Sequence, residues 1–259
     1  MRDTGLEEAI RVAGGVGALA RKIGISQPSV SNWARIPAER VLSVETATGV
    51  DRSILRPDLY GERDPRGGDL DEVDAARAQE YTLLATLLVR APDRKLLDRL
   101  ATLRGDASPI GFTHVALAEA ASRASAERAE REYFNLFIGL GRGELLPYGS
   151  YYLSGFLHER PLARLRAELR TLGIERVEGQ CEPEDHAAIL CEIMAGIING
   201  RLPADPGADR RLFENHLSPW IGRFFADLER AEAADFYKHV GTLGRVFFEI
   251  ETEAFALPS

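Results

Sequence analysis

Apolar residues recur at the spacing of an amphipathic helix through most of the chain, and from Leu70 onward no segment alternates as a half-buried strand does. Tyr81, Leu84, Ala85 and Leu88, for example, fall on one helical face. Further stripes of this kind comprise Leu162, Leu165, Leu169 and Leu172; His186, Ile189, Leu190, Ile193, Met194 and Ile197; Ile221, Phe224, Phe225 and Leu228; and Phe236, Val240, Leu243, Phe247 and Ile250. The pattern predicts an all-α fold whose apolar stripes form the core.

Turn residues separate these stripes into individual helices. An apolar helix over residues 132–140 is expected to end at Gly141-Arg142-Gly143. Pro183 has the place of a first-turn proline, and Ser218-Pro219 has the order of a capping residue followed by such a proline. Helices are therefore expected to begin near residues 183 and 219.

The first 60 residues contain three short helical patterns. Residues 6–13 and 16–23 form the first two. Gly24 can adopt a left-handed turn, Ser26 can cap the third helix, and Pro28 is tolerated in its first turn. The packing residues of a helix-turn-helix motif have the spacing seen here for Ala20, Gly24 and Val30.

With the segments 36–41 and 55–60, these residues resemble the Cro-like regulators of the YdaS type over most of residues 5–60. The resemblance places Gln27, Pro28 and Asn32 at the front of a recognition helix. Glutamine and asparagine side chains can pair with adenine in the major groove, and hydroxyl or basic side chains contact phosphates. The phosphate contacts expected here are Ser29 and Arg35, with Ser26, Ser31 and Lys22. An alternative is a degenerate domain that serves for dimerisation.

Composition suggests three parts of the chain. Residues 61–69 are polar and rich in glycine and proline, as in a linker. The expected division is a helix-turn-helix domain at 1–60, a linker at 61–72 and a helical domain at 73–259. The first part carries eight Lys or Arg and seven Asp or Glu, while the whole chain has a net charge of −8. The helical domain is therefore acidic, which suits a basic peptide better than nucleic acid.

Three dense motifs mark the helical domain. They are Leu146-Pro147-Tyr148-Gly149-Ser150-Tyr151-Tyr152-Leu153, Glu182-Pro183-Glu184-Asp185-His186 and His216-Leu217-Ser218-Pro219-Trp220. In this order they resemble the TorD/DmsD family of chaperones that mature molybdenum-containing redox enzymes, over roughly residues 75–255. The resemblance implies an all-helical chaperone fold. It also implies that Tyr148, Tyr151, Asp185 and His186 belong to a groove that receives the client's leader peptide.

The chemistry of these motifs is compatible with that role. Carboxylates accept arginine bidentately, and aromatic rings stack on guanidinium groups or hold apolar side chains. Glu182 and Glu184 therefore join the candidate set, as does Ser150. The alternatives are helix capping by Glu184 and Asp185, a buried structural role for His186, and a core position for Trp220.

No enzymatic site is expected. No nucleophile is paired with the acidic residues, and no metal-ligand spacing occurs. Gly139-x-Gly141-x-Gly143 follows a helix instead of a strand, so a helix end is favoured over a nucleotide loop.

Cys181 and Cys191 suit ordinary packing in a reduced compartment. No apolar run approaches the roughly 18 residues of a membrane span, and the first residues lack the apolar core of a signal peptide. We therefore expect a cytoplasmic protein without a metal or other cofactor.

Two hypotheses follow. In the first, the chain is a chaperone that holds the leader and apoprotein of a molybdoenzyme, such as a formate dehydrogenase or a related reductase, and the DNA-binding domain adds regulation. In the second, the chain is a transcription regulator whose helical domain senses a peptide or another ligand. A homodimer is expected, since helix-turn-helix proteins usually read DNA as dimers.

Overall fold

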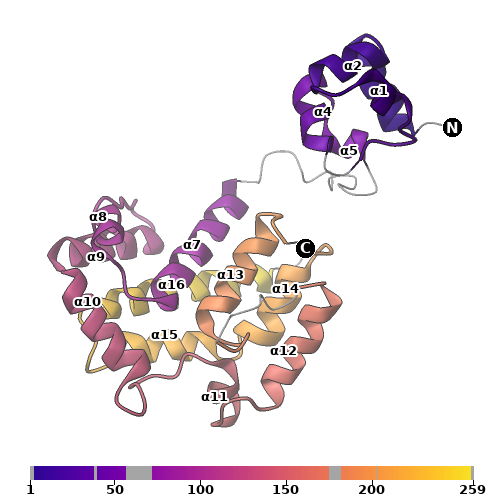
Figure 1. Cartoon of the computed structure of the whole chain (residues 1–259). Coiled ribbons are helices and arrows are strands. Elements are labelled where there is room, and N and C mark those ends of the chain that lie inside the picture. The colour runs from indigo at the N-terminus through magenta and orange to yellow at the C-terminus, as the bar shows by residue number, and fades with distance from the viewer. Residues whose placement is uncertain (1–2, 38–39, 57–71, 175–181, 203, 258–259) are drawn as a thin grey trace. The chain divides into compact units, whose positions relative to one another are not determined.

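The computed structural model describes residues 3–37, 40–56, 72–174, 182–202 and 204–257 (Figure 1). All regular elements in these ranges are helices, which confirms the all-α fold. The chain divides into two compact units, Met1–Leu70 and Asp71–Ser259. The linker expected at 61–72 lies outside the described residues except for its last position, Glu72, which begins a helix.

The described part of the smaller unit contains α1 (Thr4–Ala13), α2 (Val16–Lys22), α3 (Gln27–Ser31), α4 (Val41–Thr48) and α5 (Arg52–Leu55). Trp33 packs, partly buried, against the apolar core that these helices enclose. The fully buried side chains of this core include Leu6, Leu19, Val30, Ile36, Val41, Val44 and Leu55.

The turn between α2 and α3 has the form predicted from the sequence. Gly24 has a φ of 69°, in the left-handed region that glycine favours. Ser26 is extended, and its hydroxyl accepts a hydrogen bond from the Ser29 N–H at 3.4 Å. Pro28 lies in the first turn of α3, while Ala20 and Val30 are buried between the helices. The left-handed Gly24, the Ser26 cap and the first-turn Pro28 are therefore all found where the sequence predicted them.

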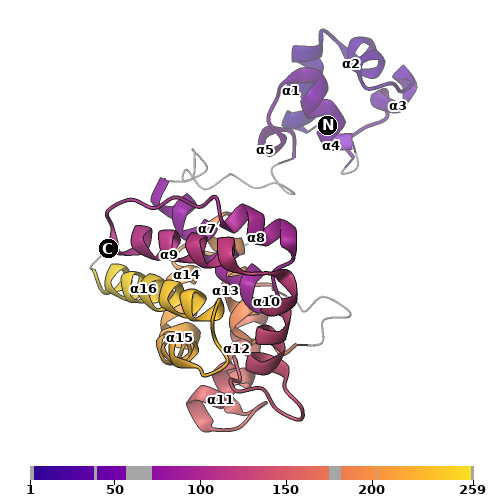
Figure 2. The same ribbon diagram turned by 90° about the vertical axis from the view of Figure 1, so that its left-hand side faces the viewer.

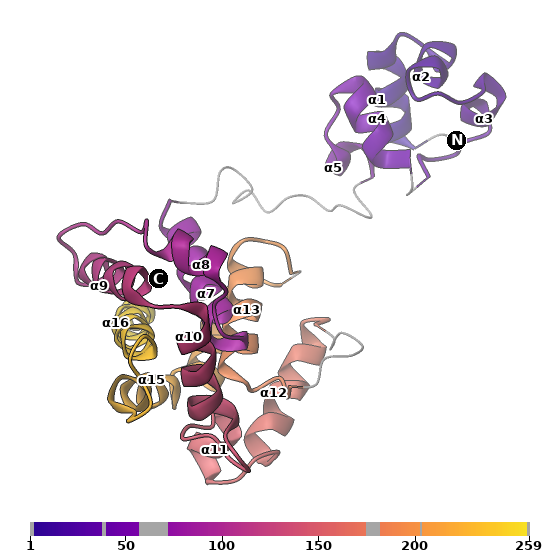
Figure 3. The same ribbon diagram turned by 60° about the vertical axis from the view of Figure 1, so that its left-hand side comes forward.

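The larger unit is a helical bundle. Its described elements are α7 (Glu72–Val89), α8 (Arg94–Leu100), α9 (Pro109–Arg123), α10 (Ala126–Tyr133), the π-helical η3 (Phe134–Ile138), α11 (Gly149–Ser154), α12 (Arg160–Thr171), α13 (Ala187–Ile198), α14 (Ala208–Leu212), the π-helical η4 (Phe213–Leu217), α15 (Ile221–Arg230) and α16 (Tyr237–Ala256). Helix α7 packs along α13, and α16 packs on α15 and α9 (Figure 2). Helix α11 lies at the end of the bundle away from α8 and α9 (Figure 3).

The predicted stripes form the core of this bundle. Tyr81, Leu84 and Leu88 of α7 are buried, as are Cys191 and Met194 of α13. Trp220 is also buried, which confirms its core position. Polar contacts connect distant helices as well: the Glu132 carboxylate of α10 accepts the N–H groups of Asp235, Phe236 and Tyr237 at 2.7, 3.1 and 2.6 Å, where α16 begins. One carboxylate thus satisfies donors that a helix end leaves unpaired.

Three predicted helix boundaries were wrong. The apolar helix ends at Gly139, because its φ of 62° leaves the helical region and its N–H closes on the Phe134 carbonyl at 2.7 Å. Helix α13 begins at Ala187, since Pro183 instead belongs to a turn closed by the His186 N–H at 3.1 Å. Helix α15 begins at Ile221, because the Ser218 N–H still bonds to the Phe213 carbonyl at 2.8 Å and so completes η4.

Candidate functional site

Two of the three motifs meet in space. Tyr148 and His186 form an isolated antiparallel β-bridge. The Gly149 N–H donates to the Asp185 carbonyl at 2.9 Å, and the Ala187 N–H donates to the Pro147 carbonyl at 2.8 Å. These main-chain bonds place the start of α11 against the start of α13, although the two segments are more than 30 residues apart in sequence.

Asp185 is almost fully buried, at 3% exposure. Its Oδ2 accepts a hydrogen bond from the Ser150 N–H at 2.7 Å, near the start of α11. Its Oδ1, like the Ser150 hydroxyl, has no hydrogen-bond partner among the described residues. A buried carboxylate oxygen without a partner is costly, so this atom favours an added donor.

His186 is the N-cap of α13 and is 6% exposed. Its Nδ1 accepts a hydrogen bond from the Ala188 N–H at 3.0 Å, and its ring meets the Tyr148 ring edge-on with centroids 5.1 Å apart. Burial lowers the pKa of His186 to about 4, although the nearby Glu182 and Asp185 favour the charged form. The imidazole is therefore neutral at ordinary pH, where its Nδ1 can accept this hydrogen bond.

The other predicted site residues lie around this junction, but each has a partner within the protein. The Tyr148 hydroxyl donates to Glu182 at 2.5 Å; burial and then this carboxylate raise the pKa of Tyr148. Glu184 pairs with Arg166 of α12 at 2.8 Å. Tyr151 accepts a hydrogen bond from Arg142 at 2.6 Å, and the guanidinium lies over its ring at 5.1 Å. A guanidinium ligand would have to exchange with these contacts.

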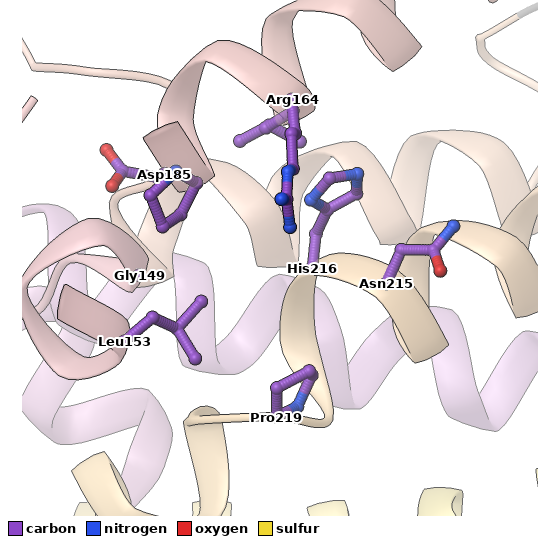
Figure 4. Close-up of a pocket in the computed structure, with 9 residues that line it drawn as sticks. Gly149, Leu153, Arg164, Asp185, Asn215, His216 and Pro219 are labelled. Atoms are coloured by element: carbon purple, nitrogen blue, oxygen red, sulfur yellow. The ribbon is translucent and has the colours of Figure 1, made fainter. Parts of the chain in front are cut away.

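A pocket of about 310 Å³ adjoins the junction (Figure 4). Asp185 lies at one side, and Arg164 and His216 extend towards the space between the helices. The third motif thus joins the same site through His216 and Pro219. The full lining comprises Gly149 and Leu153 of α11, Pro161, Arg164 and Leu165 of α12, Asp185, Asn215 and His216 of η4, and Pro219.

Several of these residues were missed from the sequence. Arg164 lies in none of the three motifs, and Asn215 lies one residue before the third. His216, by contrast, lies in the third motif, so its proximity to the others could have been anticipated. It bonds to Glu168 of α12 at 2.8 Å, and its carbonyl accepts from the Trp220 indole at 2.6 Å. Both Asn215 and His216 belong to the π-helical η4 and line the pocket. A helical wheel of 3.6 residues per turn does not describe such a segment.

In the smaller unit, the residues predicted to contact DNA are exposed together around α3. Gln27, Pro28, Ser29, Asn32 and Arg35 all face solvent. The hydroxyls of Ser26 and Ser29 lie 2.7 Å apart. The described structure therefore leaves this surface accessible.

Comparisons with known proteins match both units. Residues 104–226 match the family model described as nitrate reductase delta subunit, and residues 6–64 match that described as bacterial toxin YdaS. The chaperone protein TorD of Vibrio cholerae serotype O1 is 25% identical over 127 residues, which cover 46% of this chain and 58% of that protein. Both predicted resemblances are confirmed.

Two further relatives agree with this TorD-like and YdaS-like organisation. DmsD of Haemophilus influenzae, described as a Tat proofreading chaperone, is 26% identical over 133 residues, or 51% of this chain and 64% of that protein. YdaS of Escherichia coli, described as a transcriptional regulator, is 42% identical over 59 residues, or 20% of this chain and 60% of that protein. The chain thus spans about three fifths of the length of each of these relatives.

The described residues contain neither a metal-binding cluster nor a membrane-spanning helix. No group of three or more His, Cys, Asp or Glu side chains there could hold a metal ion. No helix in the described ranges is both long enough and apolar enough to span a bilayer.

Proposed function

We propose that this chain is a cytoplasmic chaperone that matures a molybdenum-cofactor oxidoreductase by binding its twin-arginine leader and apoprotein before cofactor insertion and export. The observation that carries the proposal is the junction of the TorD/DmsD-like motifs, where Tyr148, Ser150, Asp185 and His186 meet beside a pocket. The chaperone relatives TorD and DmsD support it. The client class is a formate dehydrogenase or a related reductase.

The geometry suggests how a leader arginine would bind. The partnerless Oδ1 of Asp185 can accept a guanidinium hydrogen bond, while Oδ2 keeps its bond to the Ser150 N–H. Glu182 can offer a second carboxylate by exchanging its bond from the Tyr148 hydroxyl. Tyr151 already holds an Arg142 guanidinium over its ring, so this ring surface is suited to a cation.

The experiment is a pull-down from the native cytoplasm with the tagged full-length chain, followed by calorimetry with a synthetic twin-arginine leader. Asp185→Asn keeps an oxygen that can accept from Ser150 but removes the charge. We expect it to weaken leader binding roughly tenfold or more, since hydrogen bonds to charged groups are the strong ones. The matched control is Asp98→Asn on α8, where the carboxylate is exposed and pairs with Arg94 at 2.7 Å.

Recovery of a molybdoenzyme subunit that Asp185→Asn loses and Asp98→Asn retains would support the proposal and name the client. Thermal unfolding of both variants separates lost binding from lost folding. Equal leader affinity in all three proteins would remove Asp185 from the binding site.

A second function, transcription regulation, is favoured by the exposed face of α3 beside an intact helix-turn-helix turn. We propose that residues 1–60 bind DNA through Gln27, Pro28, Ser29, Asn32 and Arg35, that residues 61–72 form a linker, and that residues 73–259 are the chaperone domain. Leader or apoprotein bound to the chaperone domain would regulate DNA binding. The chain would act on DNA as a homodimer.

A further inference from the structure

Arg142, in the segment between η3 and α11, contacts a side chain that was predicted to bind the leader. Its Nη2 donates a hydrogen bond to the Tyr151 hydroxyl at 2.6 Å, and its guanidinium lies over the Tyr151 ring, 5.1 Å from the centroid. Within the described ranges Tyr151 is the sole hydrogen-bond partner of this guanidinium, and no carboxylate pairs with it. Arg142 thus makes the same two contacts with Tyr151 that an arginine of a bound peptide could make.

The segment that carries Arg142 is attached to the bundle just beyond this residue. An added Cβ on Gly143 would lie 2.5 Å from the backbone of Phe137, so the glycine permits close packing on η3. The carboxylate of Glu144 accepts two N–H groups from the connection between α15 and α16, at 2.7 and 3.0 Å. Before these anchors the chain is open to solvent, and Leu140 is 98% exposed. The Arg142 side chain can therefore leave its tyrosine partner without disturbing the core.

A peptide arginine that binds Tyr151 in this way must first displace Arg142. The Tyr152 ring packs nearly perpendicular to the Tyr151 ring with centroids 5.9 Å apart, so part of the Tyr151 surface is already covered. Two guanidinium groups at one ring also repel each other. A ligand that binds only the molecules in which Tyr151 is free has its apparent affinity reduced by the fraction of such molecules.

A second arginine at α11 makes a contact of a different kind. The guanidinium of Arg223, on α15, lies over the Tyr152 ring at 5.9 Å and donates to the main-chain carbonyl of Tyr152 at 2.7 Å. The Tyr152 hydroxyl is engaged as well, since it donates to Asp227 at 2.9 Å. Arg223 is thus bonded to the backbone of α11, whereas Arg142 is bonded to a tyrosine hydroxyl.

We propose that Arg142 is an intramolecular competitor of the leader peptide, an autoinhibitory contact that a leader arginine displaces from Tyr151. This inference rests on the proposed chaperone function and adds to it a limit on affinity that the chaperone itself sets. Because Arg142 returns to Tyr151 when the leader departs, the contact stabilises the empty site. The leader is therefore held less tightly than the other contacts at the site would allow.

The test is a calorimetric titration of the full-length chain with a synthetic twin-arginine leader. Arg142→Ala should tighten leader binding about three- to tenfold, whereas the loss of a ligand contact would weaken it. In a Tyr151→Leu background the same substitution should change the affinity less than about twofold, because there is no tyrosine left to compete for. The matched control is Arg223→Ala, which removes an equal charge near α11 from a different tyrosine and should also change the affinity less than about twofold.

The possible outcomes separate the two proposals. Tighter binding in Arg142→Ala, absent from Arg223→Ala and from the Tyr151→Leu background, supports the competitor. Weaker binding, an unchanged affinity, an equal gain in Arg223→Ala, or a gain that persists without Tyr151 would overturn it while leaving the chaperone function in place. If neither the wild type nor Arg142→Ala binds the leader, the leader-binding function and the competitor are refuted together. Thermal unfolding of each variant detects a folding defect separately.

Discussion

His186 shows how one residue can serve the fold and the site at once. Its ring caps α13 through Nδ1, and its backbone pairs with Tyr148 to position α11. A protonated imidazole could not accept the Ala188 N–H and would place a charge in a buried site. Both the helix cap and the buried position of the ring therefore require the neutral form of His186.

This has a consequence for stability against pH. The folded pKa of about 4 lies below the ordinary 6.5, so between these values the unfolded chain binds a proton that the folded chain excludes. The contribution of His186 is fully present above pH 6.5 and is lost as the pH falls towards 4. Its size is about 3 kcal/mol at most, at 1.36 kcal/mol per pH unit.

Urea unfolding at pH 7.0 and 4.5 measures the effect, with His186→Asn as the comparison. Asparagine can still cap the helix but does not titrate. We expect the variant to lose less free energy of unfolding than the wild type between the two pH values. The same loss in both proteins would show that another group controls this window.

Among the secondary-structure elements, glycine, serine and proline residues predicted some turns and helix starts correctly and others wrongly. The turn at Gly24 and the cap at Ser26 are found where the sequence predicted them. Pro183 and Ser218 resembled helix starts but were not, because a turn and a π-helix occupy those positions. Where a helix begins at these positions depends on contacts across the bundle, such as the His186 cap and the Tyr148 bridge. A local sequence pattern does not contain those contacts.

Gly24 provides a test of the local rule. Its φ is 69° and no atom lies within 4 Å of an added Cβ, so a side chain there meets backbone strain but no clash. Gly24→Ala should destabilise the smaller unit by about 1–2 kcal/mol. Gly222→Ala in α15 also has open space but has no positive φ, so it should be neutral or slightly stabilising.

Thermal unfolding of the full chain, followed by circular dichroism, distinguishes these two variants. Gly24→Asn is a useful addition, because asparagine tolerates left-handed backbone and should fall between glycine and alanine. If Gly24→Ala were as stable as Gly222→Ala, strain at the turn would not contribute to the stability of the helix-turn-helix.

The sequence motifs predicted part of the candidate site but not the contacts that α12 makes with it. The motifs identified the junction, because Tyr148, Ser150, Asp185 and His186 do meet. They did not reveal that Glu184 would be paired with Arg166, or that Arg164 would line the pocket. Both features depend on how α12 packs against the junction. The apolar stripe of α12 predicts which of its side chains are buried, but not which partners its exposed side chains contact.

At the scale of the whole molecule, the two units give separable predictions. Gln27→Ala combined with Asn32→Ala should abolish specific DNA binding, because each bidentate base contact is worth about 1–3 kcal/mol. The variant should retain the leader affinity and client maturation of the wild type. DNA fragments selected from the host genome by the wild-type chain supply the probe, with Glu8→Ala on α1, away from α3, as the control.

If leader binding regulates DNA binding, the coupling must be reciprocal. The leader must change DNA affinity by the same factor by which DNA changes leader affinity. Titrations at saturating and zero concentrations of the second ligand measure both factors. If neither ligand changes the affinity for the other, the two units act independently. The regulator hypothesis would then have no mechanism by which leader binding changes DNA binding.

The burial of Cys191 has a practical consequence. Its thiol is fully buried where α13 packs along α7, and burial raises its pKa, so a thiol reagent cannot modify it in the native fold. In a Cys181→Ser background, the rate of labelling at Cys191 therefore reports how often α13 separates from α7. A chaperone domain that opens for its client would label faster with apoprotein present, whereas one that binds as a rigid body would label more slowly.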